Sequence, residues 1–205
     1  MQGRRLFVLG ATGVIGIRLV PLLVAEDHQV AGMTRSPEKA TALRELGAEP
    51  VVSDVYDSAA LERAMVDFRP DAIIDLLTDL PDDLAETPNS AAANARIRRE
   101  GTRNVIAAAR AAGALRIYAE SVAWPLGGAS GAAVEEHERS VLAAGGVVLR
   151  YGRLYGPGTY YEREAPPPPR IHVDEAARRT VAALETSSGV ITIVEALPCR
   201  RVSRM

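Results

Sequence analysis

Three glycines spaced three residues apart follow an apolar run at residues 6–9. Gly10 can form the tight turn that leaves a strand, Gly13 lets the main chain approach a ligand closely, and Gly16 lets the next helix pack against the sheet. Aligned peptide dipoles place partial positive charge at the start of that helix, where free N–H groups bind anions. The pattern therefore predicts a turn that holds the pyrophosphate of a dinucleotide. Its candidate residues are Gly10, Thr12, Gly13, Val14, Ile15 and Gly16.

The segments around the glycines bear on this interpretation, because a glycine triplet alone also fits an ordinary strand-to-helix turn. Apolar residues recur at helical spacing over residues 14–23, and a second apolar strand follows at residues 29–33. Strand, glycine turn, helix and strand form a βαβ unit, the setting in which such a triplet binds a dinucleotide. No Lys-Ser or Lys-Thr pair follows the glycines, which excludes a mononucleotide P-loop.

The composition is typical of a globular domain. The chain has 205 residues, 47% hydrophobic and 24% charged, so we expect one domain over residues 1–205 with a frayed end at 197–205. The net charge of −2 gives no electrostatic reason to expect nucleic acid or an anionic membrane as a partner. No apolar run approaches the roughly 18 residues of a membrane span. The single cysteine, Cys199, permits no internal disulfide, and a cytoplasmic protein is expected.

Strand and helix patterns alternate along the whole chain. This alternation predicts an α/β fold, a Rossmann-type doubly wound parallel sheet of about seven strands with helices on both faces and its ligand at the C-terminal strand ends. Strands are predicted at residues 6–9, 29–33, 49–52, 71–77, 115–119, 147–150 and 190–194, and helices at 14–23, 36–47, 57–67, 91–112, 132–144 and 174–185.

Two segments have an unusual composition. The predicted helix at 91–112 carries five arginines, which we interpret as a solvated face. Residues 160–170 include four consecutive prolines and are predicted to be a stiff extended connector rather than a folded unit. The five arginines are Arg96, Arg98, Arg99, Arg103 and Arg110.

Four segments, at residues 10–16, 101–105, 149–158 and 171–176, resemble the extended short-chain dehydrogenase/reductase family of NAD(P)-dependent epimerases and dehydratases. They occur in the order found in that family and span nearly the whole chain. The resemblance implies a Rossmann fold and a nicotinamide dinucleotide as cofactor. Family members often pair through two helices at the edge of the sheet, which implies a homodimer.

The resemblance also assigns residues to parts of the cofactor. Family members that bind NAD usually have an acidic residue at the end of the second strand, whereas this chain has Thr34, Arg35 and Ser36 there. A guanidinium and a hydroxyl suit a 2′-phosphate, so NADP is the expected cofactor, the alternative being that Arg35 only lies along the adenine. The family pattern places Asp54 and Val55 at the adenine, although Asp54 also fits a turn role. It places Leu76, Leu77 and Thr78 at the nicotinamide ribose.

The catalytic pair of the family is absent. Related reductases use a Tyr-x-x-x-Lys pair on the helix after the fifth strand, and the corresponding positions here are Ser130 and Val134. Lys39 is the only lysine in the chain, so no lysine can activate a tyrosine at that place. Losing such acid–base help removes about 10²–10⁴-fold in rate without forbidding catalysis by positioning.

The remaining catalytic candidates are Ser121, at the family's serine position, and Tyr151, a potential proton donor. Both could equally be hydrogen-bonded loop residues. His137 fits a surface or hydrogen-bonded residue better than a base, and no cluster has metal-ligand spacing. Other side chains expected near the nicotinamide are Glu120, Trp124 and Tyr155.

The short proline stretch stands where relatives insert a substrate lobe, so a small or aromatic substrate is expected, in an open cleft or one completed by another subunit. The first interpretation is an NADP-dependent oxidoreductase. A variant resembles the flavin and biliverdin reductases, although the epimerase-like C-terminal motifs argue against it. The alternatives are a non-catalytic module that senses NADP or binds a partner, as NmrA-like regulators do, and a non-redox lyase, isomerase or cyclase that keeps the cofactor fold.

Overall fold

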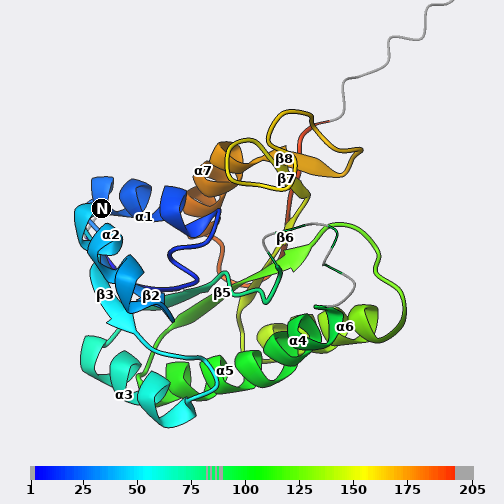
Figure 1. The fold of residues 1–205 in the computed structure, drawn as a ribbon. Helices are drawn as coiled ribbons and strands as arrows, with labels where there is room; N and C mark the ends of the chain where they lie inside the picture. The colour runs from blue at the N-terminus through cyan, green and yellow to red at the C-terminus, as the bar shows by residue number, and fades with distance from the viewer. Residues whose placement is uncertain (1–2, 82, 84, 86, 88–89, 197–205) are drawn as a thin grey trace, which may run out of the picture.

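The computed structural model describes residues 3–81, 83, 85, 87 and 90–196, and it contains the predicted parallel sheet. Seven strands lie in the order β3-β2-β1-β4-β5-β6-β9, and all neighbouring strands are parallel (Figure 1). The Rossmann-type α/β fold is thereby confirmed. The strands are β1 (Arg5–Leu9), β2 (Gln29–Thr34), β3 (Glu49–Val52), β4 (Ala72–Asp75), β5 (Arg116–Val122), β6 (Val147–Tyr151) and β9 (Gly189–Ile193).

Helices cover both faces of the sheet, which explains why its central strands are continuous apolar runs. In β1, Leu6 and Val8 pack into one core cluster while Phe7 and Leu9 pack into the other. Figure 1 shows α1 and α7 on one side of the sheet and α3, α5 and α6 on the other. The helices are α1 (Gly16–Ala25), α2 (Ala40–Glu45), preceded by the short helix η1 (Pro37–Lys39), α3 (Ser58–Phe68), α5 (Thr102–Ala111), α6 (Gly128–Ala143) and α7 (Val173–Ala183). None of the described helices is long and apolar enough to cross a membrane.

The strand order reverses its direction between β1 and β4. Leu9 at the end of β1 lies opposite Met33 of β2 on one side and opposite Asp75 of β4 on the other. The chain therefore leaves β1 and β4 in opposite directions, and a crevice forms outside their carboxyl ends. The glycine turn follows β1 directly, so it lies at this crevice.

The long helix predicted at 91–112 is divided into three parts. Between α4 (Ala91–Arg96) and α5 lies a wider, π-helical turn, η3 (Ile97–Gly101). The extra residue in that turn changes which side chains face the sheet, and Arg98 is only 5% exposed. The prediction of a solvated arginine face is therefore wrong for Arg98, whereas Arg96, Arg99, Arg103 and Arg110 are not buried.

A second, two-stranded sheet lies beyond the end of β6. Strand β7 (Arg153–Tyr155) pairs in parallel with β8 (Arg170–His172), and Arg153 lies opposite Arg170. Most of the proline-rich connector has no regular structure, but its last residue, Arg170, begins β8. The pairing joins two segments that the connector separates in the chain, a contact that no local pattern in the sequence reveals.

Candidate functional site

Each of the three glycines in the glycine turn has a different structural role. Gly10 has a φ of +72°, and a Cβ there would lie 2.9 Å from the Leu76 carbonyl oxygen, just beyond the end of β4. A Cβ on Gly16 would lie 2.3 Å from the Gly10 carbonyl oxygen, so Gly16 allows α1 to start against the turn itself. A Cβ on Gly13 would meet only the Gly10 oxygen, at 3.2 Å, so that side of the turn faces open space. The turn thus leaves its Gly13 side open, and a contact of this side with a diphosphate stays a prediction.

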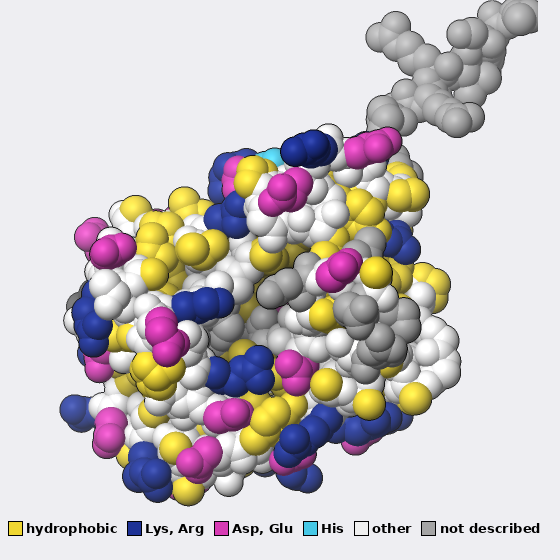
Figure 2. Space-filling model, in the orientation of Figure 1, with side chains coloured by type: hydrophobic (Ala, Val, Ile, Leu, Met, Phe, Trp, Pro, Cys, Tyr) yellow, Lys and Arg dark blue, Asp and Glu magenta, His cyan; other side chains and the backbone are white. Residues whose placement is uncertain are grey.

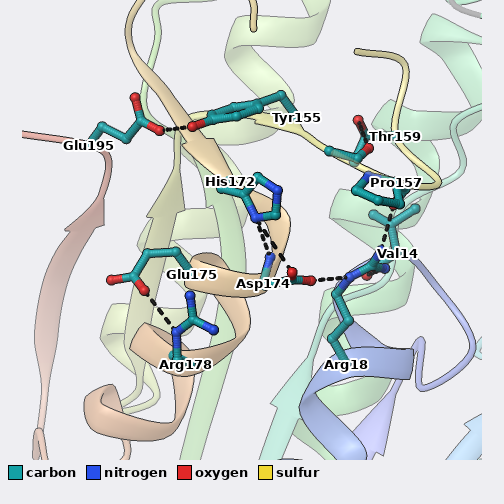
Figure 3. A network of polar contacts seen from close by, with 11 residues as sticks. Val14, Arg18, Tyr155, Pro157, Thr159, His172, Asp174, Glu175, Arg178 and Glu195 are labelled. Carbon is teal, nitrogen blue, oxygen red and sulfur yellow. Dashed lines mark hydrogen bonds and ion pairs between the residues drawn. The ribbon is translucent and has the colours of Figure 1, made fainter. Parts of the chain in front are cut away.

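Arg18 fixes the first turn of α1 to two distant segments. Its guanidinium donates to the Val14 carbonyl at 2.8 Å, to Asp174 Oδ1 at 2.7 Å and to the Pro157 carbonyl at 2.6 Å (Figure 3). Asp174 belongs to α7, and Pro157 follows β7. The glycine turn, α7 and the two-stranded sheet are therefore held together by one side chain.

The motif at 171–176 also supports the start of α7. The Nδ1 atom of His172 accepts the backbone N–H of Asp174 at 3.3 Å and thereby caps the helix. The Tyr155 ring packs edge-on against His172, and its hydroxyl donates to Glu195 (Figure 3). Tyr155, expected near the nicotinamide, thus has a partner in the two-stranded sheet region, and Trp124 lies under the Arg153 guanidinium at 4.9 Å.

The residues predicted to select the cofactor lie at the end of β2. The hydroxyl oxygens of Thr12 and Thr34 are 3.3 Å apart, which joins the glycine turn to this strand end. The backbone N–H of Ser36 donates to the Thr34 hydroxyl at 3.2 Å. The side chain of Arg35 is 54% exposed, and its Nη2 lies 3.6 Å from Asp79 Oδ1. Arg35 is therefore an accessible cation at the edge of the crevice. The face of the molecule in Figure 2 has a hollow with basic side chains beside it.

The two residues predicted at the adenine have structural partners. Asp54 Oδ1 accepts the backbone N–H of Tyr56 at 2.9 Å, the turn role that the sequence left open. Val55 is 2% exposed, and its carbonyl accepts from Asn104 Nδ2 at 2.9 Å. A contact of Asp54 and Val55 with adenine stays a prediction.

The end of β4 combines a buried acid with half-buried loop residues. Asp75 is 6% exposed, and its Oδ1 accepts the backbone N–H of Leu77 at 3.1 Å. Burial raises the pKa of Asp75 to about 7, which places its titration in the neutral range. Leu76 is buried, whereas Leu77 and Thr78 are half-buried where the chain leaves the sheet.

Ser121 is fully buried and lies in an ion-pair network. Its Oγ donates to Glu138 Oε1 at 2.6 Å. Arg150 binds both oxygens of the same carboxylate, at 2.9 and 2.5 Å. Burial alone would raise the pKa of Glu138, but the hydrogen bonds from Arg150 and Ser121 outweigh it and lower that pKa. Ser121 is thus held by a carboxylate that stays ionised, so its hydroxyl can accept a further hydrogen bond but not donate one.

Arg98 and its neighbours form a buried polar cluster that the sequence did not reveal. Arg98 Nη2 donates to Glu120 Oε1 at 2.6 Å, and both side chains are largely buried. His137 bonds to the Thr102 hydroxyl at 2.6 Å and to the Glu120 carbonyl at 2.9 Å. Burial and the charge of Arg98 lower the pKa of His137, which keeps the imidazole neutral. His137 is therefore a hydrogen-bonded interior residue, one of the two roles expected for it.

Tyr151 lies inside the core and away from solvent. It is 3% exposed, and its hydroxyl lies 2.6 Å from the Thr180 hydroxyl of α7. Burial raises the pKa of Tyr151 far above its usual value. A phenol with a raised pKa is a weak acid, so this geometry favours a structural role for Tyr151, and proton donation by Tyr151 stays a prediction.

The structure brings together four of the six predicted sites. The glycine turn and the ends of β2 and β4 meet at one crevice, and Ser121 lies on the next strand, β5. Tyr151 faces Thr180 instead. Within the described residues, no group of three or more His, Cys, Asp or Glu side chains could hold a metal ion.

Residues 10–144 match a protein family described as NAD(P)H-binding. The chain is also 34% identical over 226 residues to the 3-diazoavenalumate denitrifying reductase of a Streptomyces species. That alignment covers 90% of this chain and 73% of the reductase.

Solved structures share the fold at low sequence identity. The UDP-glucose 4-epimerase of Thermus thermophilus, in complex with NAD, aligns with a TM-score of 0.77 and 18% identity, over 94% of this chain and 78% of the epimerase. The enzyme WbmH of Bordetella bronchiseptica, in complex with NAD+, aligns with a TM-score of 0.75 and 18% identity, over 95% of this chain and 76% of that enzyme. At this identity the likeness concerns the fold alone.

Proposed function

The chain belongs to the NAD(P)H-binding family, and on that premise we propose that it is an NADP(H)-dependent reductase of a small aromatic substrate. Its resemblance to the short-chain dehydrogenases/reductases is confirmed by the family match and by the fold. The observation that carries the proposal is the glycine turn, whose Gly13 side is open for a diphosphate. The exposed cation Arg35 supports NADP, because a guanidinium binds a 2′-phosphate well.

When bound, the cofactor supplies a hydride from C4 of its nicotinamide ring. The chain's contribution is to hold the cofactor and the substrate close together in a reactive orientation. Such positioning can replace a large part of the rate enhancement that the missing acid–base pair would give. Ser121 lies on β5, beside the strand end predicted to face the nicotinamide ribose. Because Ser121 is fully buried and Glu138 takes its hydroxyl hydrogen, Ser121 could not activate a carbonyl oxygen by donation.

The substrate class that best suits such a site is an aromatic compound with a diazonium group. Removing that group reductively adds a hydride to the ring carbon, while the carbon–nitrogen bond breaks and its electron pair leaves with dinitrogen. This exchange consumes no proton, whereas reduction of a carbonyl needs a proton at the oxygen. A site without the Tyr–Lys pair can therefore perform it, and the similarity to a denitrifying reductase supports the proposal.

The experiment that tests the function compares substrates in the presence of NADPH. Purified protein is mixed with NADPH and with aryl diazonium salts, ketones, aldehydes, quinones or flavins, and reduced nicotinamide is followed by absorbance. We expect consumption and release of dinitrogen with the diazonium salts, above the rate without protein. Tight NADPH binding with no turnover on any substrate would contradict the reductase function and favour a non-catalytic module that binds NADP. The partners proposed are the cofactor and the substrate, and a homodimer and a cytoplasmic location stay predictions.

Replacing Arg35 by alanine is expected to weaken NADPH binding about 10- to 100-fold, because a hydrogen bond to a charged group contributes about 1.5–3 kcal/mol. NADH affinity should stay nearly constant, since NADH has no 2′-phosphate. Calorimetric titration of both cofactors measures this, with Arg44→Ala, a change at an exposed arginine of α2, as the control. Equal losses for the two cofactors, or tighter NADH binding by the unaltered protein, would contradict the NADP assignment.

Replacing Tyr151 by phenylalanine is expected to lower the free energy of unfolding by about 1 kcal/mol, because the hydrogen bond to Thr180 is lost in the core. Turnover should stay within about twofold of the unaltered protein, as a structural hydroxyl predicts. Urea unfolding and steady-state rates measure the two effects. A fall in turnover by more than a power of ten with unchanged stability would restore Tyr151 as the proton donor.

A further inference from the structure

Arg98 carries hydrogen-bond donors that its own protein does not satisfy. Its side chain is 4% exposed, and only Nη2 has a partner, Glu120 Oε1 at 2.6 Å. Nε and Nη1 are buried too, and no acceptor in the described part of the chain lies within reach of either. Buried polar groups are nearly always hydrogen-bonded, because losing water without gaining a partner costs free energy. The guanidinium therefore has two donors left for an acceptor from outside the described residues.

The position of Arg98 identifies which part of a dinucleotide would meet it. Leu9 lies opposite Asp75, and Asp75 lies opposite Ala119 on β5. Arg98 pairs with the residue after Ala119, and its charge acts on Asp75. The guanidinium thus lies near the ends of β4 and β5, whereas Arg35 lies beyond the glycine turn on the β2 side. A dinucleotide with its diphosphate at the turn and its adenosine toward β2 places its other nucleoside at β4 and β5.

The charges around Arg98 favour a neutral acceptor. Glu120 offsets the guanidinium charge at 2.6 Å, and the buried Asp75 acts on the same group. An added anion would be repelled by the Glu120 carboxylate and would lose its own hydration. A hydroxyl oxygen accepts a hydrogen bond without that cost. Lys39, the only lysine in the chain, belongs to η1 after β2 and does not serve this end of the crevice.

We propose that Arg98 donates a hydrogen bond from its unpaired guanidinium edge to a hydroxyl of the nicotinamide ribose, an inference that rests on the proposed function. The π-helical turn η3 places this cation inside the fold, and the pair with Glu120 holds it there. Arg98 is thus a cofactor-binding residue that the arginine pattern of the sequence concealed. In this chain Val134 of α6 stands where related reductases have a lysine, and Arg98 supplies a cationic donor from a different helix.

The test compares NADPH with adenosine 2′,5′-bisphosphate, which has the adenosine half of the cofactor and no nicotinamide ribose. The variant is Arg98→Met with Glu120→Gln, so that no carboxylate is left buried without its partner. We expect about tenfold weaker NADPH binding by calorimetry and unchanged binding of the bisphosphate. Arg98→Lys, which keeps a cationic donor, should recover most of the NADPH affinity.

A matched control lies on the same helix. Arg99 pairs with Glu136 at 2.7 Å, but both side chains are exposed. Arg99→Met with Glu136→Gln should therefore change neither affinity. NADPH binding by the Arg98 variant equal to that of the unaltered protein would overturn the inference, and so would equal weakening of both ligands. If the unaltered protein binds neither ligand, the proposed function itself fails.

Discussion

Replacing Gly16 by alanine is expected to abolish binding of both NADPH and NADH and to lower the free energy of unfolding by about 3 kcal/mol. A Cβ at this position would lie 2.3 Å from the Gly10 carbonyl oxygen and 2.7 Å from the Ala11 backbone. Both contacts are with main chain, so no side-chain rotation can relieve them. The start of α1 must move away from the turn, and the free N–H groups that would bind a diphosphate move with it. Urea unfolding and calorimetric titration measure the two effects.

Two further glycine variants separate loss of fold from loss of the site. Gly127→Ala is the control, because Gly127 has a φ of −92° and a Cβ there would meet nothing within 4 Å. Gly13→Ala should lower stability only slightly, since its Cβ would touch one atom at 3.2 Å, yet it should weaken both cofactors because the Cβ occupies the open side of the turn. If Gly13→Ala binds NADPH as well as the unaltered protein does, the diphosphate does not lie at this turn.

Replacing Asp75 by asparagine is expected to stabilise the protein at neutral and alkaline pH, by up to about 4 kcal/mol at pH 8. Burial raises the pKa of Asp75 from 3.8 to about 7. Between these values the folded state holds a proton that the unfolded state releases, so the contribution of Asp75 to stability falls as pH rises through this range. Asparagine does not ionise, and its carbonyl oxygen can still accept the N–H of Leu77.

The measurement is the difference between the unfolding free energies of the two proteins from pH 4 to pH 8. The difference should be small at pH 4 and should grow with pH until it levels off above pH 7. Asp67→Asn, on the exposed face of α3, serves as the control and should give a flat difference. A difference curve for Asp75→Asn that is equally flat would show that the buried carboxyl is ionised at no cost.

The fold was predictable because its signals are local. Each central strand is an apolar run buried on both faces, and glycines such as Gly47 and Gly113, with φ of +85° and +72°, end helices where the sequence indicates. The glycine turn was predictable for the same reason, since the close approaches that require its glycines lie within residues 10–16 or against the exit of β4. The Gly16 contact differs in detail, because its close approach is to the turn rather than to the sheet.

The interior of the site was not predictable, because it depends on distant partners. Arg98 looked like one of five solvated arginines, and only the widened turn η3 and its pairing with Glu120 bring it inside. Tyr151 stands at a strand end, but the α7 hydroxyl of Thr180, 29 residues further on, determines its role. The sequence feature that comes nearest to indicating the widened turn η3 is Gly101. A Cβ there would lie 3.1 Å from Ile97 in the same turn.

The three hydrogen bonds of Arg18 limit where a longer substrate-binding insertion can be engineered into this chain. The carbonyl of Pro157 is one of the points on which the first helical turn rests. New sequence introduced after that residue can leave this acceptor in place, whereas a change that moves the backbone at Pro157 would break its hydrogen bond to Arg18. We expect an engineered insertion to change the substrate and keep the affinity for the coenzyme only if it leaves the hydrogen bond between Arg18 and the Pro157 carbonyl intact.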